Sequence, residues 1–242
     1  MENKKIAMWS GPRNMSTVLM RSFSSRPDCK VVDEPFYAAY LLATGAKHPL
    51  RDLIIESQST DAKIISKECI AGSSSKKIEY QKHMTHHMIK AFDRSFIYKL
   101  SNVFLIRSPE KVVQSLGLKL ENYQLKDTGF PQQLELFQMI AEKQGFAPPV
   151  INADDLCTYP KNGLKALCTS LGIEYFESML RWSKGPHEDD GVWGQYWYRS
   201  VNESTGFEKK NKKILLSTSA EKKLIEKATP FYETISNFKI SF

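Results

Sequence analysis

The sequence has no long hydrophobic run, although 41% of its 242 residues are hydrophobic. The start, Met1 to Lys5, is charged, and the apolar stretch that follows ends at Trp9. A stretch of this length is too short for the core of a signal peptide or for a membrane span. We therefore expect a cytoplasmic protein without a membrane partner.

Cysteine is also scarce. The chain has no CxxC pair, and its cysteines are Cys29, Cys69, Cys157 and Cys168. This spacing indicates neither a zinc site nor a disulfide framework, so we assign no metal ligands. Free and mostly buried thiols in a reducing compartment are the simplest interpretation.

Acidic residues are fewer than basic ones: the chain has 27 aspartates and glutamates and 34 lysines and arginines. The net charge of +7 favours an anionic partner, and much of the excess lies between Lys209 and Lys227. No recognition motif for nucleic acid accompanies it. We expect a small polyanionic ligand and no nucleic acid.

Short apolar runs alternate with helical patterns along the chain. The predicted strands are Lys4–Trp9, Cys29–Val32, Ile78–Gln81, Asn102–Ile106 and Pro149–Ala153. The predicted helices are Asn14–Phe23, a helix that begins at Pro109, and a helix from about Asn162 to Leu171. This alternation predicts a single α/β domain over residues 1–242, with a mostly parallel central sheet flanked by helices. The loops after the first four strands should then converge at one edge, where such sheets bind ligands.

The segment Ser10–Thr17 (SGPRNMST) joins the first predicted strand to the first predicted helix. Backbone N–H groups and the helix dipole favour an anion at such a turn. It is similar to a P-loop, but the last Gly, Lys and Ser/Thr of G-x-x-x-x-G-K-[ST] are replaced by Ser16, Thr17 and Val18. The groups that reach the outer phosphates and Mg²⁺ are therefore missing. A helix start capped by Asn14 or Ser16 is the alternative interpretation.

A second candidate follows the clearest predicted strand, where Arg107 is followed by Ser115 eight residues later. An arginine at a strand end can bind a phosphate through two N–H groups, and a serine in the next helix adds a hydroxyl. An ordinary arginine near a helix start is the alternative.

Together, the two motifs resemble those of sulfotransferases that use 3′-phosphoadenosine 5′-phosphosulfate (PAPS). The family's 5′-phosphosulfate loop has the core Lys/Arg-Ser-Gly-Thr-Thr, from which residues 13–17 depart at Asn14 and Met15. Its 3′-phosphate motif is an arginine and a serine eight residues later. The resemblance, which covers residues 4–120 well, implies PAPS as co-substrate. The donor-binding residues it implies are Gly11, Pro12, Arg13, Asn14, Met15, Ser16, Thr17, Arg107 and Ser115.

The resemblance also implies a metal-independent in-line transfer, in which cations stabilise the departing phosphate. Arg13 takes the place of the family's loop lysine, and Lys82 follows the third predicted strand, where the family often has Lys-x-His. His83 is one residue nearer to the lysine than that spacing requires, which leaves His86 as a second candidate base. A surface lysine and structural histidines are the alternatives.

A carboxylate competes with these histidines as the general base. Glu34 lies in Val31–Phe36 (VVDEPF), and several bacterial and carbohydrate sulfotransferases have Glu-Pro at this place. The adjacent Asp33 would raise its pKa. Alternatively, both carboxylates simply end the strand and pair with arginines. The sequence does not decide between Glu34 and a histidine.

The acceptor is expected to be a small molecule with a hydroxyl or an amine. An aromatic segment, Gly191–Arg199, is interpreted as core, with a pocket wall or a cage for a cation as the alternative. Lys209 and Lys210 lie where family members close a loop over the 3′-phosphate. A homo-oligomer is compatible with the sequence.

Two other functions stay open at this point. A P-loop kinase or nucleotide hydrolase is disfavoured by the missing Lys-Ser/Thr pair, whereas a non-catalytic nucleotide-binding protein is compatible with the departures at Asn14 and Met15. The chain also resembles bacterial sulfotransferase-like proteins, some of which are named aminotransferases. A pyridoxal enzyme needs a Schiff-base lysine, and the sequence marks no lysine as one.

Overall fold

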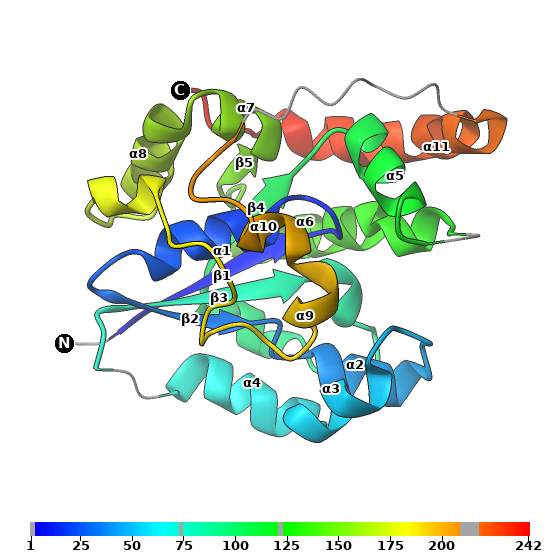
Figure 1. Cartoon of the computed structure of the whole chain (residues 1–242), viewed down its shortest axis with the longest axis horizontal. Coiled ribbons are helices and arrows are strands. Elements are labelled where there is room, and N and C mark those ends of the chain that lie inside the picture. The colour runs from blue at the N-terminus through cyan, green and yellow to red at the C-terminus, as the bar shows by residue number, and fades with distance from the viewer. Residues whose placement is uncertain (1–2, 73–74, 121–122, 209–217) are drawn as a thin grey trace.

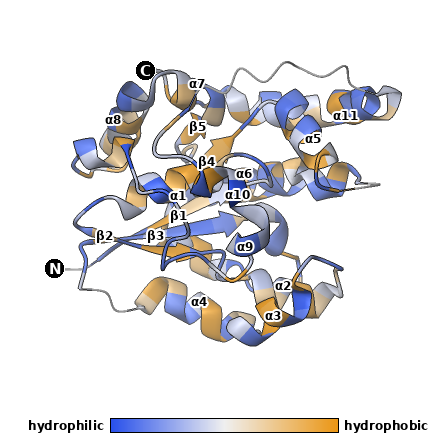
Figure 2. Cartoon of the chain, in the orientation of Figure 1, coloured by the Kyte–Doolittle hydropathy of each residue, from blue (hydrophilic) through white to orange (hydrophobic). Residues whose placement is uncertain are grey.

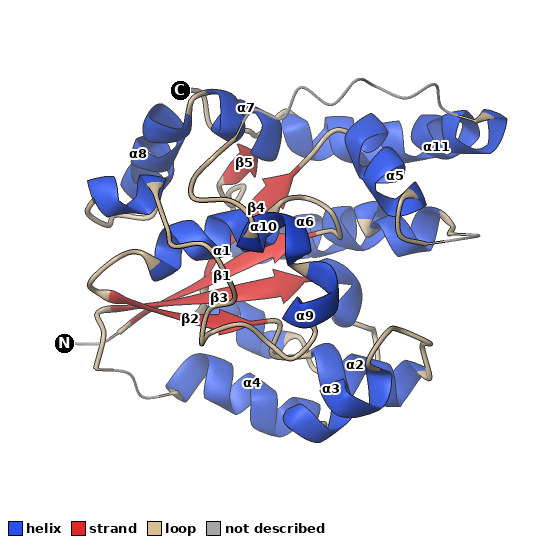
Figure 3. Ribbon diagram, in the orientation of Figure 1, coloured by secondary structure: helices blue, strands red, loops and turns tan. Residues whose placement is uncertain are grey.

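A sheet of five parallel strands forms the centre of the computed structural model, which describes residues 3–72, 75–120, 123–208 and 218–242 (Figure 1). The strand order is β2-β3-β1-β4-β5. The strands are β1 (Lys4–Ser10), β2 (Cys29–Asp33), β3 (Ile78–Met84), β4 (Ser101–Ile106) and β5 (Val150–Asn152). All five predicted strands and the α/β fold class are confirmed. Each strand pairs in parallel with its neighbours, and Figure 3 shows the strands in red between the helices.

Helices connect and cover these strands. They are α1 (Ser16–Ser24), α2 (Tyr37–Thr44), α3 (Arg51–Ser57), α4 (Ala62–Ala71), α5 (Pro109–Gly117), α6 (Phe130–Gln144), α7 (Ala153–Thr158), α8 (Pro160–Ser170), α9 (Gly194–Trp197), α10 (Arg199–Asn202) and α11 (Ser219–Ser236). The described ranges also contain short 3-10 helices, which are η1 (Thr85–His87), η2 (Ser95–Lys99), η3 (Leu125–Thr128) and η4 (Glu177–Leu180). The three predicted helices correspond to α1, α5 and α8. Within the described ranges, no helix has the length and hydropathy needed to cross a membrane.

The two larger hydrophobic cores of the described residues lie on opposite faces of the sheet. Ile6 and Met8 of β1 pack in one core with residues of α1 and α8. Ala7 and Trp9 belong to the other core, with residues of α4 and α6. Because side chains alternate along a strand, a sheet covered on both faces needs the near-continuous apolar strands that this sequence has. Figure 2 shows the hydrophobic and hydrophilic bands on the covering helices.

The order of the strands positions the site. β1 lies between β3 and β4, so the chain passes from one side of β1 to the other between these two strands. A crevice forms outside the carboxyl ends of the strands at such a switch point. The loops after the first four strands all contribute to one cavity of about 1020 Å³, so the predicted convergence is confirmed.

Candidate functional site

The turn after β1 presents a row of residues to the cavity. Pro12, Arg13, Met15, Ser16 and Thr17 all line it. The cap position of α1 is Met15, and no side chain caps the helix. The alternative that Asn14 or Ser16 caps this helix is therefore wrong. An uncapped helix start leaves backbone N–H groups for an anion.

Two residues of the loop have a left-handed backbone conformation, although the loop sequence departs from the family motif. Met15 stands in the place of the motif's glycine and has φ 65°, and Arg13 has φ 64°. This left-handed conformation is the one that glycine adopts without strain. Asn14 points away from the cavity and its amide donates to the carbonyl of Leu105 (3.0 Å), which ties the loop to β4.

Gly11, also predicted to bind the donor, does not line the cavity. A Cβ atom at this position would lie 2.8 Å from the carbonyl oxygen of Thr128. Glycine is therefore required where the loop crosses the chain just before α6. Gly11 and Asn14 shape the loop, while its other predicted residues form the cavity wall.

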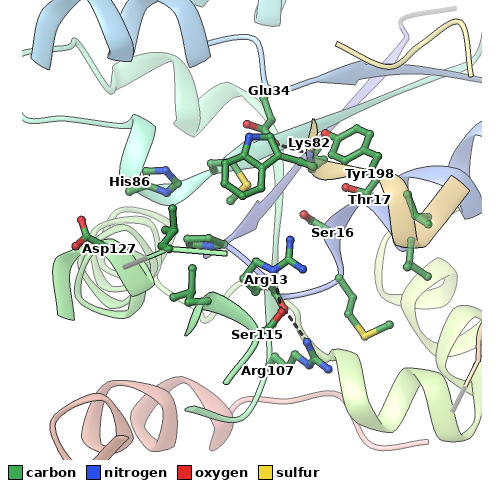
Figure 4. A pocket seen from close by; sticks show the side chains of 18 of the residues that line it. Arg13, Ser16, Thr17, Glu34, Lys82, His86, Arg107, Ser115, Asp127 and Tyr198 are labelled. Carbon is green, nitrogen blue, oxygen red and sulfur yellow. Dashed lines mark hydrogen bonds and ion pairs between the residues drawn. The ribbon is translucent and has the colours of Figure 1, made fainter. Parts of the chain in front are cut away.

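The two predicted phosphate motifs contact each other directly. Arg13 Nε donates to Ser115 Oγ (2.8 Å), and the guanidinium of Arg107 donates to the carbonyl oxygen of Arg13 (2.9 Å). Figure 4 shows the three side chains together at the base of the cavity. Burial, and then the charge of Arg107, lowers the pKa of Arg13. An arginine side chain stays protonated in proteins, so Arg13 is a cation. The result is a cationic cluster with hydroxyl donors, suited to an anion with several phosphate groups.

Lys82 is buried and has three polar partners. Its ammonium donates to Asp33 Oδ1 (2.9 Å), to Glu34 Oε1 (2.5 Å) and to the hydroxyl of Tyr198. An ammonium has three N–H donors, so these partners use all of them. Although burial opposes its charge, the two carboxylates raise the pKa of Lys82, so it is held as a cation.

Glu34 lies where the cavity meets this buried cluster. Burial raises the pKa of Glu34, and the nearby Asp33 raises it further, against the opposing effect of Lys82. Two carboxylates that share one ammonium leave an excess negative charge in a buried place, which favours protonation of one of them. Glu34 lines the cavity, so its proton can exchange with a bound molecule.

The structure places His83 on the opposite face of the sheet from Lys82. The strand β3 runs to Met84, three residues beyond its predicted end, so Lys82 and His83 are successive residues within the strand. Their side chains therefore alternate between faces. His83 stacks on Trp9 with ring centroids 4.5 Å apart and is absent from the cavity wall, where Met84 lies instead. The Lys-x-His spacing would have put both groups on one face.

His86 and His87 both line the cavity, on the turn η1. The Nδ1 atoms of both rings are buried without a hydrogen-bond partner. Burial lowers the pKa of His86 to about 3 and that of His87 well below its usual value, so both imidazoles are neutral. His87 Nδ1 lies 4.0 Å from Glu34 Oε2.

Aromatic side chains form the wall around Glu34. Tyr37 and Tyr40 on α2 stack on His87, with ring centroids 4.6 and 4.8 Å apart. Two residues of the predicted aromatic segment, Trp197 and Tyr198, also line the cavity. Tyr198 is in addition the residue whose hydroxyl accepts from Lys82. Tyr37 and Tyr40 were not singled out by sequence reasoning, because two tyrosines three residues apart on a helix usually indicate core packing.

Other parts of the segment Gly191–Arg199 belong to the core. Trp193 is buried, and its indole N–H donates to the hydroxyl of Tyr198 (2.9 Å), whereas Tyr196 is exposed. The four aromatic residues therefore do not form a cage together. The predicted residues Lys209 and Lys210 lie outside the described residues.

Comparison with known proteins gives a consistent family. A family model described as "Sulfotransferase domain" matches residues 4–238. Among solved structures, the sulfotransferase domain of the Synechococcus PCC 7002 olefin synthase has a TM-score of 0.60 at 17% identity, covering 98% of this chain and 96% of that one. Mouse sulfotransferase SULT7A1 complexed with PAP has a TM-score of 0.57 at 10% identity, covering 98% and 90%. At these identities, the structures show the shared fold.

Two curated relatives are named after a different class of enzyme, the aminotransferases. "Branched-chain-amino-acid aminotransferase-like protein 1" of Arabidopsis thaliana is 35% identical over 97% of this chain and 42% of its own length. "Branched-chain-amino-acid aminotransferase-like protein 2" of the same plant is 31% identical over 95% of this chain and 41% of its own length. The chain thus spans less than half the length of these relatives. Their names describe the longer proteins, and more than half of each of those proteins lies outside the part that matches this chain.

Proposed function

Because the chain belongs to the sulfotransferase domain family, we propose that it transfers a sulfuryl group from PAPS to a hydroxyl or amine of a small molecule. The observation that carries this proposal is the contact of Arg13 with both Ser115 and Arg107. It joins the loop after β1 to the motif after β4, so a 5′-phosphosulfate and a 3′-phosphate of one nucleotide have cationic groups in the same cavity.

The chemistry of these residues fits such a donor. Arg13 and Arg107 supply charge, and Ser16, Thr17 and Ser115 supply hydroxyl donors at an uncapped helix start. The fit is poorer for a nucleotide that needs Mg²⁺, because Thr17 and Val18 replace the Lys-Ser/Thr pair. PAPS, when bound, supplies the sulfuryl group and leaves as 3′-phosphoadenosine 5′-phosphate (PAP).

We assign Arg13 to stabilising the negative charge of the leaving group. Negative charge develops on the departing phosphate as its bond to sulfur breaks, and a cation close to that oxygen stabilises it. Lys82 was the other predicted cation, but its three donors are used by Asp33, Glu34 and Tyr198. We therefore assign Lys82 to holding Glu34 in place.

Glu34 is assigned as the general base. The new bond forms between sulfur and the acceptor oxygen or nitrogen, and the proton of that atom passes to the Glu34 carboxylate. A raised pKa suits this step, because a base with a pKa near working pH accepts the proton more readily. His86 is a less suitable base, since burial holds its pKa at about 3. His83 has no role in this assignment, because it lies on the opposite face of β3.

Thermal unfolding with added nucleotides tests the donor. A ligand at a hundred times its Kd stabilises a fold by about 2.7 kcal/mol, which raises Tm by about 5–11 °C for a chain of this size. We expect this shift with PAP in the presence of EDTA, a smaller one with 5′-AMP, and its loss in Arg107→Ala. The matched control is Arg51→Ala, which removes an arginine outside the cavity wall and should keep the shift. A shift with Mg-ATP alone would instead favour a kinase.

A further inference from the structure

A lysine that neither phosphate motif contains faces the donor side of the cavity. Lys111 lies four residues before Ser115 on α5, and residues at this spacing share one face of a helix. Both line the cavity. The helix face that presents the serine of the 3′-phosphate motif therefore also presents an ammonium, one turn nearer to Arg107.

The partner of Lys111 is an aspartate fixed by the neighbouring strand. In the sheet, Ile106 of β4 pairs with Asn152 of β5, so the segments after these strands lie next to each other. The Asn152 side chain accepts hydrogen bonds from the backbone N–H groups of Asp154 and Asp155, which caps α7. Asp154 is thereby held beside the residue that follows β4, which is Arg107.

One carboxylate oxygen faces two cations at this point. Asp154 Oδ1 lies 2.9 Å from Lys111 Nζ and 3.5 Å from Arg107 Nε. The side chain of Lys111 is 46% exposed and that of Asp154 is 23% exposed. Ion pairs with this exposure contribute little to stability, so the pair can open at low cost. A phosphate group carries more charge than one carboxylate and has three acceptor oxygens, so it is the stronger partner for both cations.

We infer that Lys111 is a third ligand for the donor's 3′-phosphate and that Asp154 holds Lys111 beside Arg107 until this phosphate binds. When a 3′-phosphate lies between Arg107 and Ser115, the Lys111 ammonium exchanges its ion pair with Asp154 for one with the phosphate. A nucleotide without a 3′-phosphate leaves the Lys111–Asp154 pair closed. Lys111 thus favours donors that carry the 3′-phosphate. This inference rests on the proposed function, since it assumes that PAP and PAPS bind in this cavity.

The negative charge of Asp154 also weakens binding of the 3′-phosphate. The cap of α7 fixes the backbone of Asp154 next to Arg107, so its carboxylate stays close to the bound phosphate and repels it. Replacing it by asparagine keeps the size of the side chain and removes this repulsion. Asp154→Asn should therefore bind PAP more tightly than the wild type, whereas Lys111→Met should bind it more weakly.

The experiment is calorimetric titration of PAP and 5′-AMP into the full chain and its variants. We expect Lys111→Met to weaken PAP binding by about tenfold to a hundredfold, the size of a charge-assisted hydrogen bond to phosphate, and to leave 5′-AMP binding within about twofold. Asp154→Asn should tighten PAP binding several-fold and leave 5′-AMP binding unchanged. The matched control is Lys67→Met, which removes the same charge from an exposed position on α4 outside the cavity wall and should change neither affinity.

The outcomes separate this inference from the proposed function. If the wild type shows no preference for PAP over 5′-AMP, the proposed donor is wrong and the inference falls with it. If the wild type prefers PAP but Lys111→Met keeps that preference, the donor stands and the role of Lys111 is wrong. Equal losses of PAP and 5′-AMP binding in Lys111→Met, or weaker PAP binding in Asp154→Asn, would likewise overturn it. Far-ultraviolet circular dichroism of each variant identifies one that has failed to fold, and Asp154→Asn then supplies the independent test.

Discussion

Lys82 Nζ lies 2.5 Å from Glu34 Oε1, inside a buried cluster in which a second carboxylate, Asp33, accepts from the same ammonium. The lysine is therefore a fixed counter-ion for the carboxylate that faces the cavity. A buried pair of this kind is costly to break, because removal of one partner leaves an uncompensated charge. The chemistry proposed for Glu34 thus depends on Lys82 and Asp33 as well as on Glu34 itself.

Glu34→Gln removes the proposed base and preserves the size of the side chain. We expect kcat to fall by about 10²–10⁴-fold, the usual contribution of a general base. PAP affinity should stay unchanged, because the donor site is assigned to Arg13, Arg107 and Ser115. Steady-state kinetics and PAP titration of the same preparation check both points. A variant that keeps full activity would show that another group accepts the proton.

The pH dependence of kcat/KM should show the raised pKa of Glu34. The base acts when ionised, so the rate falls as the pH drops through the pKa of Glu34. Because burial raises that pKa, the acid limb should lie above the 4.5 of an ordinary glutamate. An acid limb at or below the ordinary value would contradict this assignment. In Glu34→Gln this limb should be absent from the residual activity.

Tyr198 is expected to act as a positioning residue for this pair. Its hydroxyl donates to Asp33 and accepts from Lys82 and from Trp193, so Tyr198→Phe leaves buried polar groups without a partner. We expect a loss of about 1–3 kcal/mol in the free energy of unfolding. The acid limb of the rate profile should also move to higher pH, since the Tyr198 hydroxyl helps to lower the pKa of Glu34.

The exposed neighbour Tyr196 offers the control for this experiment. Tyr196→Phe removes a hydroxyl from the same segment and should change neither the stability nor the pH profile. If Tyr198→Phe loses stability but keeps the wild-type acid limb, the role of Tyr198 is structural alone.

Buried histidines should make the fold sensitive to acid. Burial lowers the pKa of His83 and His86 to about 3, so the unfolded chain binds protons that the folded chain does not. Their stabilising contribution is present above pH 6.5 and is lost as the pH falls towards 3. Each proton contributes a slope of about 1.4 kcal/mol per pH unit. Urea unfolding between pH 7 and pH 5 measures this slope, which should be reduced in His83→Phe. An unchanged slope in that variant would contradict the assignment of a buried, neutral His83.

The sheet and the meeting of the two phosphate motifs at one edge of it could be predicted from the sequence. Apolar runs such as Asn102–Ile106 and the turn at Gly11 and Pro12 are local signals, and parallel topology follows from their alternation with helices. Arg13, Arg107 and Ser115 could be placed together because the carboxyl ends of parallel strands share an edge. The extra strand residues Lys82, His83 and Met84 were missed, since the polar side chains of Lys82 and His83 interrupt the apolar signal before Met84.

The acceptor side could not be predicted in the same way. The contact between Lys82 and Tyr198 joins residues 116 positions apart, and no local pattern encodes it. Tyr198 was recognised only as one of four aromatic residues in a short segment. Lys111 had a usable signal, its spacing of four from Ser115, but the meaning of that spacing depends on knowing that Ser115 faces the cavity.

Formation of PAP from PAPS is the decisive evidence for sulfuryl transfer. The protein is incubated with PAPS and EDTA, with and without a pool of small alcohols and amines, and both PAP and sulfated products are measured by mass spectrometry. We expect acceptor-dependent PAP release matched by one or more sulfated products, both strongly reduced in Glu34→Gln. A chain that binds PAP but forms neither product with any acceptor would contradict catalysis and identify a non-catalytic nucleotide-binding protein.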